Sequence, residues 1–330
     1  MKNRLALLVL GAVAMSIGTT SVSAQALTDR KPKGQEVIYR LNDGASYIEG
    51  CFDPCLCPIS FSGIRGTLTL KQTGMFGNVF TYAVDDVNWF VGNGATQDRL
   101  ITGSGTYTRI SGFAGWVHEI ELKLSIDGGP FVEFNSGLQF GGGDFPDISG
   151  LSVNMNDLFC YDIQIGIDAS NVPADEVLVE QLVVNESSLT QGCLPPCLCP
   201  IAFLGNLTGE ATFVPLIDSG NYQEFAVVNV AWKTVPFAVP ADFPHVPRTF
   251  IGNGRYVRIV GIAGFLQEME LSLSDTGAPA EVFASGLVDG GADYPVFGIS
   301  ISDNDFVCFN RVLGLSFKPR PAPLIQAGTP

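Results

Sequence analysis

Two carboxylates placed two residues apart, downstream of an arginine and a tyrosine, form the pattern of this sequence best suited to acid–base chemistry. The first pair is Glu119 and Glu121, and Tyr107 and Arg109 precede it. If the intervening hairpin turn is centred on Phe113, all four side chains lie on one face of a sheet. The carboxylates could then act as general acid and base of a glycosidase-like hydrolase. The same residue types recur in the second half of the chain as Tyr256, Arg258, Glu268 and Glu270.

A structural interpretation of these residues is a cross-strand ion pair on the solvent-facing side of a sheet. Ile120, Leu122 and Leu124 alternate with the glutamates and must face the core. We therefore expect the four glutamates to be structural, and keep them as the candidate catalytic residues. His118 and His245 are the two histidines, and neither recurs in the other half. A nucleophile activated by a histidine base is therefore poorly supported.

The tripeptide 275–277 (Asp-Thr-Gly) resembles the active-site tripeptide of the aspartic proteases, which are also secreted, rich in β-structure and bilobed. The resemblance covers three residues, because the matching turn at 127–129 reads Asp-Gly-Gly. Asp-Gly pairs are common in hairpin turns, so we expect turns here. Trp89 and Trp232 also match one another and could stack on a sugar, although large aromatic residues more often fill a core.

The cysteines fall into two sets of four with the same spacing. Each set reads C-x₃-C-x-C and ends with a cysteine about a hundred residues later. In an exported chain this predicts a disulfide framework in which one early cysteine reaches the late one. The remaining pairing stays open, and the alternative is a four-thiolate metal site. The residues are Cys51, Cys55, Cys57, Cys160, Cys193, Cys197, Cys199 and Cys308.

Side-chain oxygens gather in several loops of this acidic chain. Carboxylate and amide oxygens bind Ca²⁺, but none of these loops has the ligand spacing of an EF-hand. We expect most of them to be turns, and no other cofactor is indicated. The candidate calcium ligands are Asp144, Asp157, Asp293 and Asp305.

The chain contains two copies of one sequence. Residues 50–59 (GCFDPCLCPI) recur as 192–201 (GCLPPCLCPI), and 116–124 (WVHEIELKL) recur as 265–273 (FLQEMELSL). Because all eight cysteines also match in order, we predict two similar domains. The predicted parts are a signal peptide at 1–24, a linker at 25–33, copy 1 at 34–171, copy 2 at 172–318 and a Pro-rich tail at 319–330.

Apolar and polar residues alternate with a period of two within each copy, most strictly at 118–126. Clusters of Gly, Asp and Asn separate these runs, and no convincing helical stripe follows the first 24 residues. The sequence therefore predicts an all-β protein of two tandem homologous antiparallel β-sandwich or β-barrel domains, stapled by disulfides. Strand order, which periodicity does not supply, decides between sandwich and barrel.

The first 24 residues read as a secretory signal peptide. Lys2 and Arg4 precede a short apolar stretch that ends in small residues at Ala24. Cleavage after Ala24 removes these two bases and no acid, so the net charge changes from −15 to −17. So acidic a chain repels nucleic acid and anionic lipid. We predict an exported protein, periplasmic or extracellular, with no membrane span and no nucleic-acid partner.

Duplication without a shared catalytic set favours a binding or structural role, in which two equivalent faces raise avidity. The partners that fit are a surface polysaccharide, another exported protein or a small apolar ligand. Self-association through exposed sheet edges is a further alternative. A carboxylate-based secreted hydrolase is the competing function.

Overall fold

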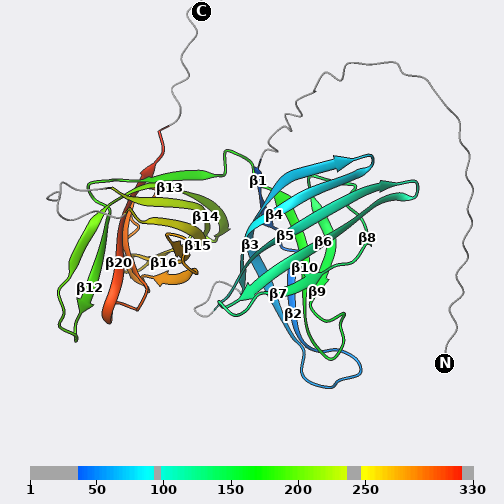
Figure 1. The fold of residues 1–330 in the computed structure, drawn as a ribbon, viewed down its shortest axis with the longest axis horizontal. Helices are drawn as coiled ribbons and strands as arrows, with labels where there is room; N and C mark the ends of the chain where they lie inside the picture. The colour runs from blue at the N-terminus through cyan, green and yellow to red at the C-terminus, as the bar shows by residue number, and fades with distance from the viewer. Residues whose placement is uncertain (1–35, 93–97, 236–246, 322–330) are drawn as a thin grey trace, which may run out of the picture. The chain divides into compact units, whose positions relative to one another are not determined.

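The computed structural model describes residues 36–92, 98–235 and 247–321, and every regular element in them is a strand (Figure 1). The predicted signal peptide and linker, His245 and most of the predicted tail lie outside these residues. Two antiparallel sheets of ten strands each account for the fold, which confirms the all-β prediction. Within the described residues, no helix is long and apolar enough to cross a membrane.

The first sheet is built from residues of copy 1. Its long strands β3 to β6 follow one another as hairpins, in the order expected when short turns join antiparallel neighbours. The strands are β1 (Glu36–Leu41), β2 (Ser46–Cys51), β3 (Ser60–Phe76), β4 (Val79–Val91), β5 (Arg99–Gly112), β6 (Gly115–Ile126), β7 (Val132–Asn135), β8 (Gln139–Phe140), β9 (Ile148–Asn154) and β10 (Tyr161–Asn171).

The second sheet repeats this arrangement with residues of copy 2. Each of its strands corresponds to one in the first sheet, from β11 for β1 to β20 for β10. The strands are β11 (Leu178–Leu182), β12 (Ser188–Leu194), β13 (Ala202–Asp218), β14 (Tyr222–Val235), β15 (Thr249–Gly261), β16 (Gly264–Asp275), β17 (Glu281–Ala284), β18 (Val288–Asp289), β19 (Phe297–Ser302) and β20 (Cys308–Pro319).

Each sheet closes on itself, which favours the barrel over the sandwich. In copy 1 the order runs from β10 through β2 to β7 and β9, and β9 pairs with β10 again. The ring of strands is most weakly paired between β7 and β9, which pair through Asn135 and Asn154 alone among the described residues. In copy 2 the corresponding join between β17 and β19 is the pair of Ala284 with Ser302. The neighbouring residues of β19 therefore have a strand on one side.

The alternating pattern places one face of every long strand in the core. Ile120, Leu122 and Leu124 of β6 are buried, whereas Glu121 between them is exposed. Trp89 and Trp232 are fully buried in the cores of their copies, which favours the core interpretation over sugar stacking. Burial of large aromatic side chains contributes strongly to the stability of such cores.

All eight cysteines form disulfides within their own copies, so the alternative of a four-thiolate metal site is wrong. Cys51 bonds Cys57 and Cys55 bonds Cys160. Copy 2 repeats both bonds, with Cys193–Cys199 and Cys197–Cys308. The expectation that an early cysteine reaches the late one is confirmed. Four disulfides indicate an oxidising, exported environment.

Candidate functional site

The hairpin between β5 and β6 separates the residues that the sequence pattern placed together. Its turn holds two residues, with Gly112 opposite Gly115, so Arg109 lies opposite His118 and Tyr107 opposite Ile120. The prediction of one shared face is wrong, because a turn one residue shorter moves every side chain to the other face. The arginine and tyrosine therefore share the inner face with Ile120, while the glutamates lie on the outer face.

Arg109 is a structural residue of copy 1. Its Nε and Nη2 atoms donate hydrogen bonds of 2.8 and 2.5 Å to the Gly142 carbonyl oxygen. Its guanidinium carbon lies 4.4 Å from the centre of the Trp116 ring and 4.2 Å from that of Phe145. These contacts hold the glycine-rich loop before β9 against the hairpin.

Arg258 repeats this role in copy 2. Its Nε atom donates to the Gly291 carbonyl at 2.5 Å, and its guanidinium carbon lies 4.4 Å from the centre of the Phe265 ring. The recurrence of Tyr and Arg in the sequence therefore reflects a repeated loop anchor rather than a repeated catalytic pair.

The tyrosines bond to the residue at the position of His118. Tyr107 Oη lies 3.1 Å from His118 Nδ1, and Tyr256 donates to Gln267 Oε1 at 3.0 Å. His118 is fully buried, and burial, followed by the nearby charge of Arg109, lowers the pKa of its imidazole. A neutral imidazole without solvent access cannot serve as the base of a surface site.

The four glutamates lie on the outer face, where the ion-pair interpretation holds in copy 2 with a different arginine. Arg255 Nη2 lies 3.4 Å from a carboxylate oxygen of Glu270 and 3.9 Å from one of Glu268. In copy 1, Thr108 and Thr106 lie opposite Glu119 and Glu121.

Asp275 of the protease-like tripeptide is paired with Arg248 at 3.1 Å and Arg311 at 3.2 Å.

The candidate calcium ligands lie in exposed turns. Asp144 and Asp293 use their backbone carbonyls to accept turn hydrogen bonds, from Asp147 and Val296 respectively. Asp157 donates its backbone N–H to Asn154. The described residues contain no group of three or more His, Cys, Asp or Glu side chains placed to hold a metal ion.

One groove of copy 1 brings together a candidate catalytic residue, Glu121, and a candidate calcium ligand, Asp157. Its volume is about 520 Å³, and Glu121 and Asp157 both line it, together with Asp85 and Glu133. Asn135 and Asn154, which form the thin join of the ring, line it as well.

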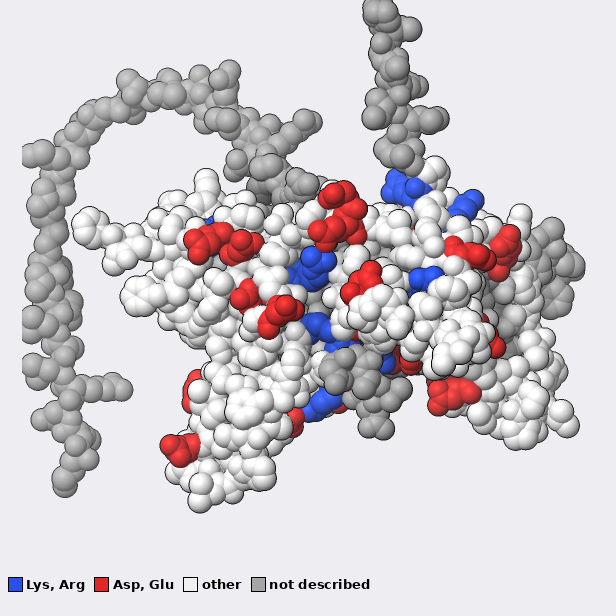
Figure 2. Space-filling view, turned by 180° about the vertical axis from the view of Figure 1, so that it is seen from behind, with Lys and Arg blue, Asp and Glu red and all other residues white. Residues whose placement is uncertain are grey.

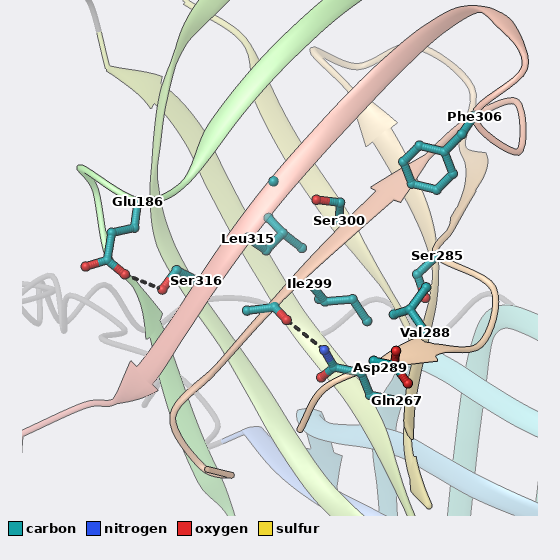
Figure 3. A pocket seen from close by; sticks show the side chains of 12 residues that line it. Glu186, Gln267, Ser285, Val288, Asp289, Ile299, Ser300, Phe306, Leu315 and Ser316 are labelled. Atoms are coloured by element: carbon teal, nitrogen blue, oxygen red, sulfur yellow. Dashed lines mark hydrogen bonds between the residues drawn. The ribbon is translucent and has the colours of Figure 1, made fainter. Parts of the chain in front are cut away.

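A second groove lies in copy 2 beside β19 and has a volume of about 730 Å³ (Figure 3). Gln267 of β16 and Val288 of β18 lie on one side of it. Ile299 and Ser300 of β19 line the other side, and Leu315 of β20 completes the floor. Gln267 donates from Nε2 to the Gly298 carbonyl at 2.7 Å, which fixes one end of the groove.

The same place in copy 1 is filled by a side chain. Gln139 stands at the position of Val288, since Gln139 pairs with His118 and Val288 pairs with Gln267. Its Nε2 donates to the Ser152 carbonyl at 3.0 Å, and its Oε1 accepts from the Ser152 N–H at 3.3 Å. Valine can form neither bond, so the groove is open in copy 2.

The backbone of β19 turns hydrogen-bonding groups toward this groove. Ser316 of β20 directs its N–H to Ser187 Oγ at 3.0 Å and its carbonyl to the Val183 N–H at 2.8 Å, both away from β19. Its partner Gly298 therefore points its own groups away from β20. Because this pattern repeats every second residue, the N–H and carbonyl of Ser300 also face the groove. No described strand pairs with Ser300 on that side.

The sequence analysis missed this groove. The available signal was a difference between the copies: Gln139 and Gln164 of copy 1 correspond to Val288 and Val312 of copy 2. Gln164 also donates to Ser152, at its Oγ atom, at 2.8 Å. Both glutamines bond to one serine, so their joint replacement by valine marks a site that only the structure locates.

Charged side chains are dispersed over the face shown in Figure 2, and wide areas of this face carry neither acidic nor basic side chains.

We found no match to this chain among protein-family models, curated proteins or solved structures.

Proposed function

We propose that this chain is an exported binding protein, periplasmic or extracellular, whose ligand lies in the groove beside β19. The observation that carries the proposal is the contrast between the copies. Gln139 closes the position in copy 1, whereas Val288 leaves a groove of about 730 Å³ in copy 2. A concave site with a few directed polar groups is the usual form of a binding pocket.

The chemistry of the lining favours binding over hydrolysis. Its ionisable side chains are Glu186 and Asp289, and Glu186 accepts a hydrogen bond of 2.8 Å from Ser316 Oγ. The remaining polar groups that line it are serine hydroxyls, the Gln267 amide and the backbone. Serine nucleophiles are activated by a histidine or lysine base, and the groove lining contains neither residue type.

The two copies are not equivalent in this proposal. Two like faces would raise avidity, but the groove is open in copy 2 and bridged in copy 1. Copy 1 then serves as a scaffold.

The test is a ligand screen against the purified, non-reduced protein with a variant that closes the groove. Immobilised wild-type protein and Val288→Gln are probed with an oligosaccharide array and with a heptapeptide library. Leu56→Ser, at a fully exposed position of copy 1, is the surface control. We expect a ligand that binds wild type and Leu56→Ser and loses at least tenfold in affinity for Val288→Gln. Ligands that bind all three proteins equally would refute the proposal.

A further inference from the structure

We infer that the ligand of this groove is an extended peptide segment that adds to the free edge of β19 as an antiparallel or parallel strand. This inference rests on the proposed function and narrows it to one ligand class. Addition of a strand to a sheet edge supplies main-chain hydrogen bonds, and pockets beside the edge select side chains.

Gln139 shows which chemistry the site accepts. Its side-chain amide donates to the Ser152 carbonyl and accepts from the Ser152 N–H. Those are the two hydrogen bonds that a residue of a neighbouring strand makes with its partner. The amide of Gln139 thus takes the place of a peptide group, and the matching serine of copy 2, Ser300, keeps its backbone groups directed at an open groove. A polypeptide backbone supplies that complement with the spacing of a strand.

The length of the free edge limits the peptide. Residues 298–300 of β19 line the groove, and three residues of strand span about 10 Å. The Gly298 carbonyl already accepts from Gln267, so Ser300 is the residue that offers both its N–H and its carbonyl to a peptide. At the rise of an extended strand, a peptide segment of about three to four residues covers this edge.

The lining also selects the side chains of the peptide. Val288, Ile299 and Leu315 supply the apolar surface of the groove. The ionisable residues of the lining, Glu186 and Asp289, are both acidic. A strand with an apolar residue facing the groove and a lysine or arginine beside it is therefore complementary. Since the chain carries a net charge of −15, basic segments are also attracted over longer distances.

Amide hydrogen exchange tests the edge without knowledge of the ligand. We expect the Ser300 amide to exchange rapidly in the free protein and the Ser152 amide to be protected by Gln139. Val288→Gln should protect Ser300, and the reciprocal Gln139→Val should expose Ser152. Rapid exchange at both serines in wild type would contradict the geometry on which the inference depends.

Peptide binding is measured with heptapeptides from the library, of the type Lys-apolar-x-apolar, labelled with a fluorophore. We expect binding to wild type that protects the Ser300 amide, at least a tenfold loss with Val288→Gln, and a similar loss when the central peptide nitrogens are methylated. Glu186→Gln with Asp289→Asn should weaken lysine-containing peptides several-fold and leave neutral ones unchanged. Gln139→Val should create a second peptide site at Ser152.

The outcomes separate this inference from the proposed function. Selective binding of an oligosaccharide that Val288→Gln abolishes would keep the binding function and overturn the peptide assignment. Peptides that bind without protecting Ser300, or that tolerate N-methylation, would also overturn it. If Val288→Gln changes the binding of no ligand, both fall. Unchanged thermal unfolding of Val288→Gln confirms that a loss of binding arises in the groove.

Discussion

Glu180 should make the stability of copy 2 decrease as the pH rises. It lies on β11 and is fully buried, and within the described residues neither carboxylate oxygen has a hydrogen-bond partner. Its counterpart in copy 1 is Tyr39, because Tyr39 pairs with Leu68 where Glu180 pairs with Ala211. Burial without a compensating partner disfavours the charged carboxylate and raises the pKa of Glu180 to about 7.

The magnitude follows from the difference between the folded and unfolded pKa values. The ordinary pKa of 4.5 and the folded value of about 7 differ by roughly 2.5 units, which corresponds to about 3 kcal/mol. The folded pKa is the higher one, so the folded chain holds its proton more tightly. The stability contribution is therefore fully present below pH 4.5 and is lost as the pH rises to about 7.

The assay is urea-induced unfolding between pH 4.5 and pH 8, read by pulsed hydrogen–deuterium exchange in peptides from Leu178–Pro319. This readout follows copy 2 alone and leaves the disulfides oxidised. We expect wild type to lose about 3 kcal/mol across this range and Glu180→Gln to lose much less, since glutamine does not ionise. Glu121→Gln, at an exposed site, should behave like wild type. A parallel decline in wild type and Glu180→Gln would refute the assignment of a buried, protonated carboxyl.

Further predictions concern the framework. Removing the Cys55–Cys160 disulfide with the double variant Cys55→Ser and Cys160→Ser should destabilise copy 1 by about 5 kcal/mol. The double variant Cys51→Ser and Cys57→Ser should cost about 2 kcal/mol, because the loop that its disulfide closes is much shorter. Equal losses in urea unfolding would contradict this entropic account. Arg109→Met should lower the free energy of unfolding by about 3 kcal/mol, because the buried hydrogen bonds to Gly142 are lost. The control Glu119→Gln should change it by less than about 0.5 kcal/mol. Similar losses for both variants in calorimetry would show that Arg109 does not anchor the glycine-rich loop. His118→Gln should retain stability to within about 1.5 kcal/mol, since copy 2 uses glutamine against the matching tyrosine; a loss of several kcal/mol would show that the imidazole has a role that Gln267 does not share.

The sequence alone was sufficient for the fold class, because its signals are local. A period of two requires strands with one buried face, and this applies to β6 whatever its neighbours are. Matched cysteines in an exported chain predict bonds within each copy, and the approach of an early cysteine to Cys160 followed from the need to close the domain. The burial of Trp89 and Trp232 could be anticipated from size and apolarity.

The placement of the candidate site residues depended on register, which is not local. The turn after β5 is one residue shorter than the assumed one, and this moved Arg109 and Tyr107 from the face of Glu119 to the face of Ile120. A difference of one residue in turn length is hardly visible in the sequence, yet it moves every side chain of the following strand to the opposite face relative to its partners. No composition or spacing argument could choose between the two registers.

Barrel closure and the groove were decided by the tertiary structure alone. β19 pairs with β17 at Ser302 only. Whether the backbone groups along the rest of this edge find a hydrogen-bond partner depends on a side chain from another strand. That side chain is Gln139 in copy 1, which bonds to β9, and Val288 in copy 2, which cannot bond to β19. The burial of Glu180 likewise depends on strands from distant parts of copy 2. The sequence determined which residues face inward on each strand, because alternation is a property of one strand; the sites where hydrogen bonds are left unmade arise between strands, and only their assembly defines them.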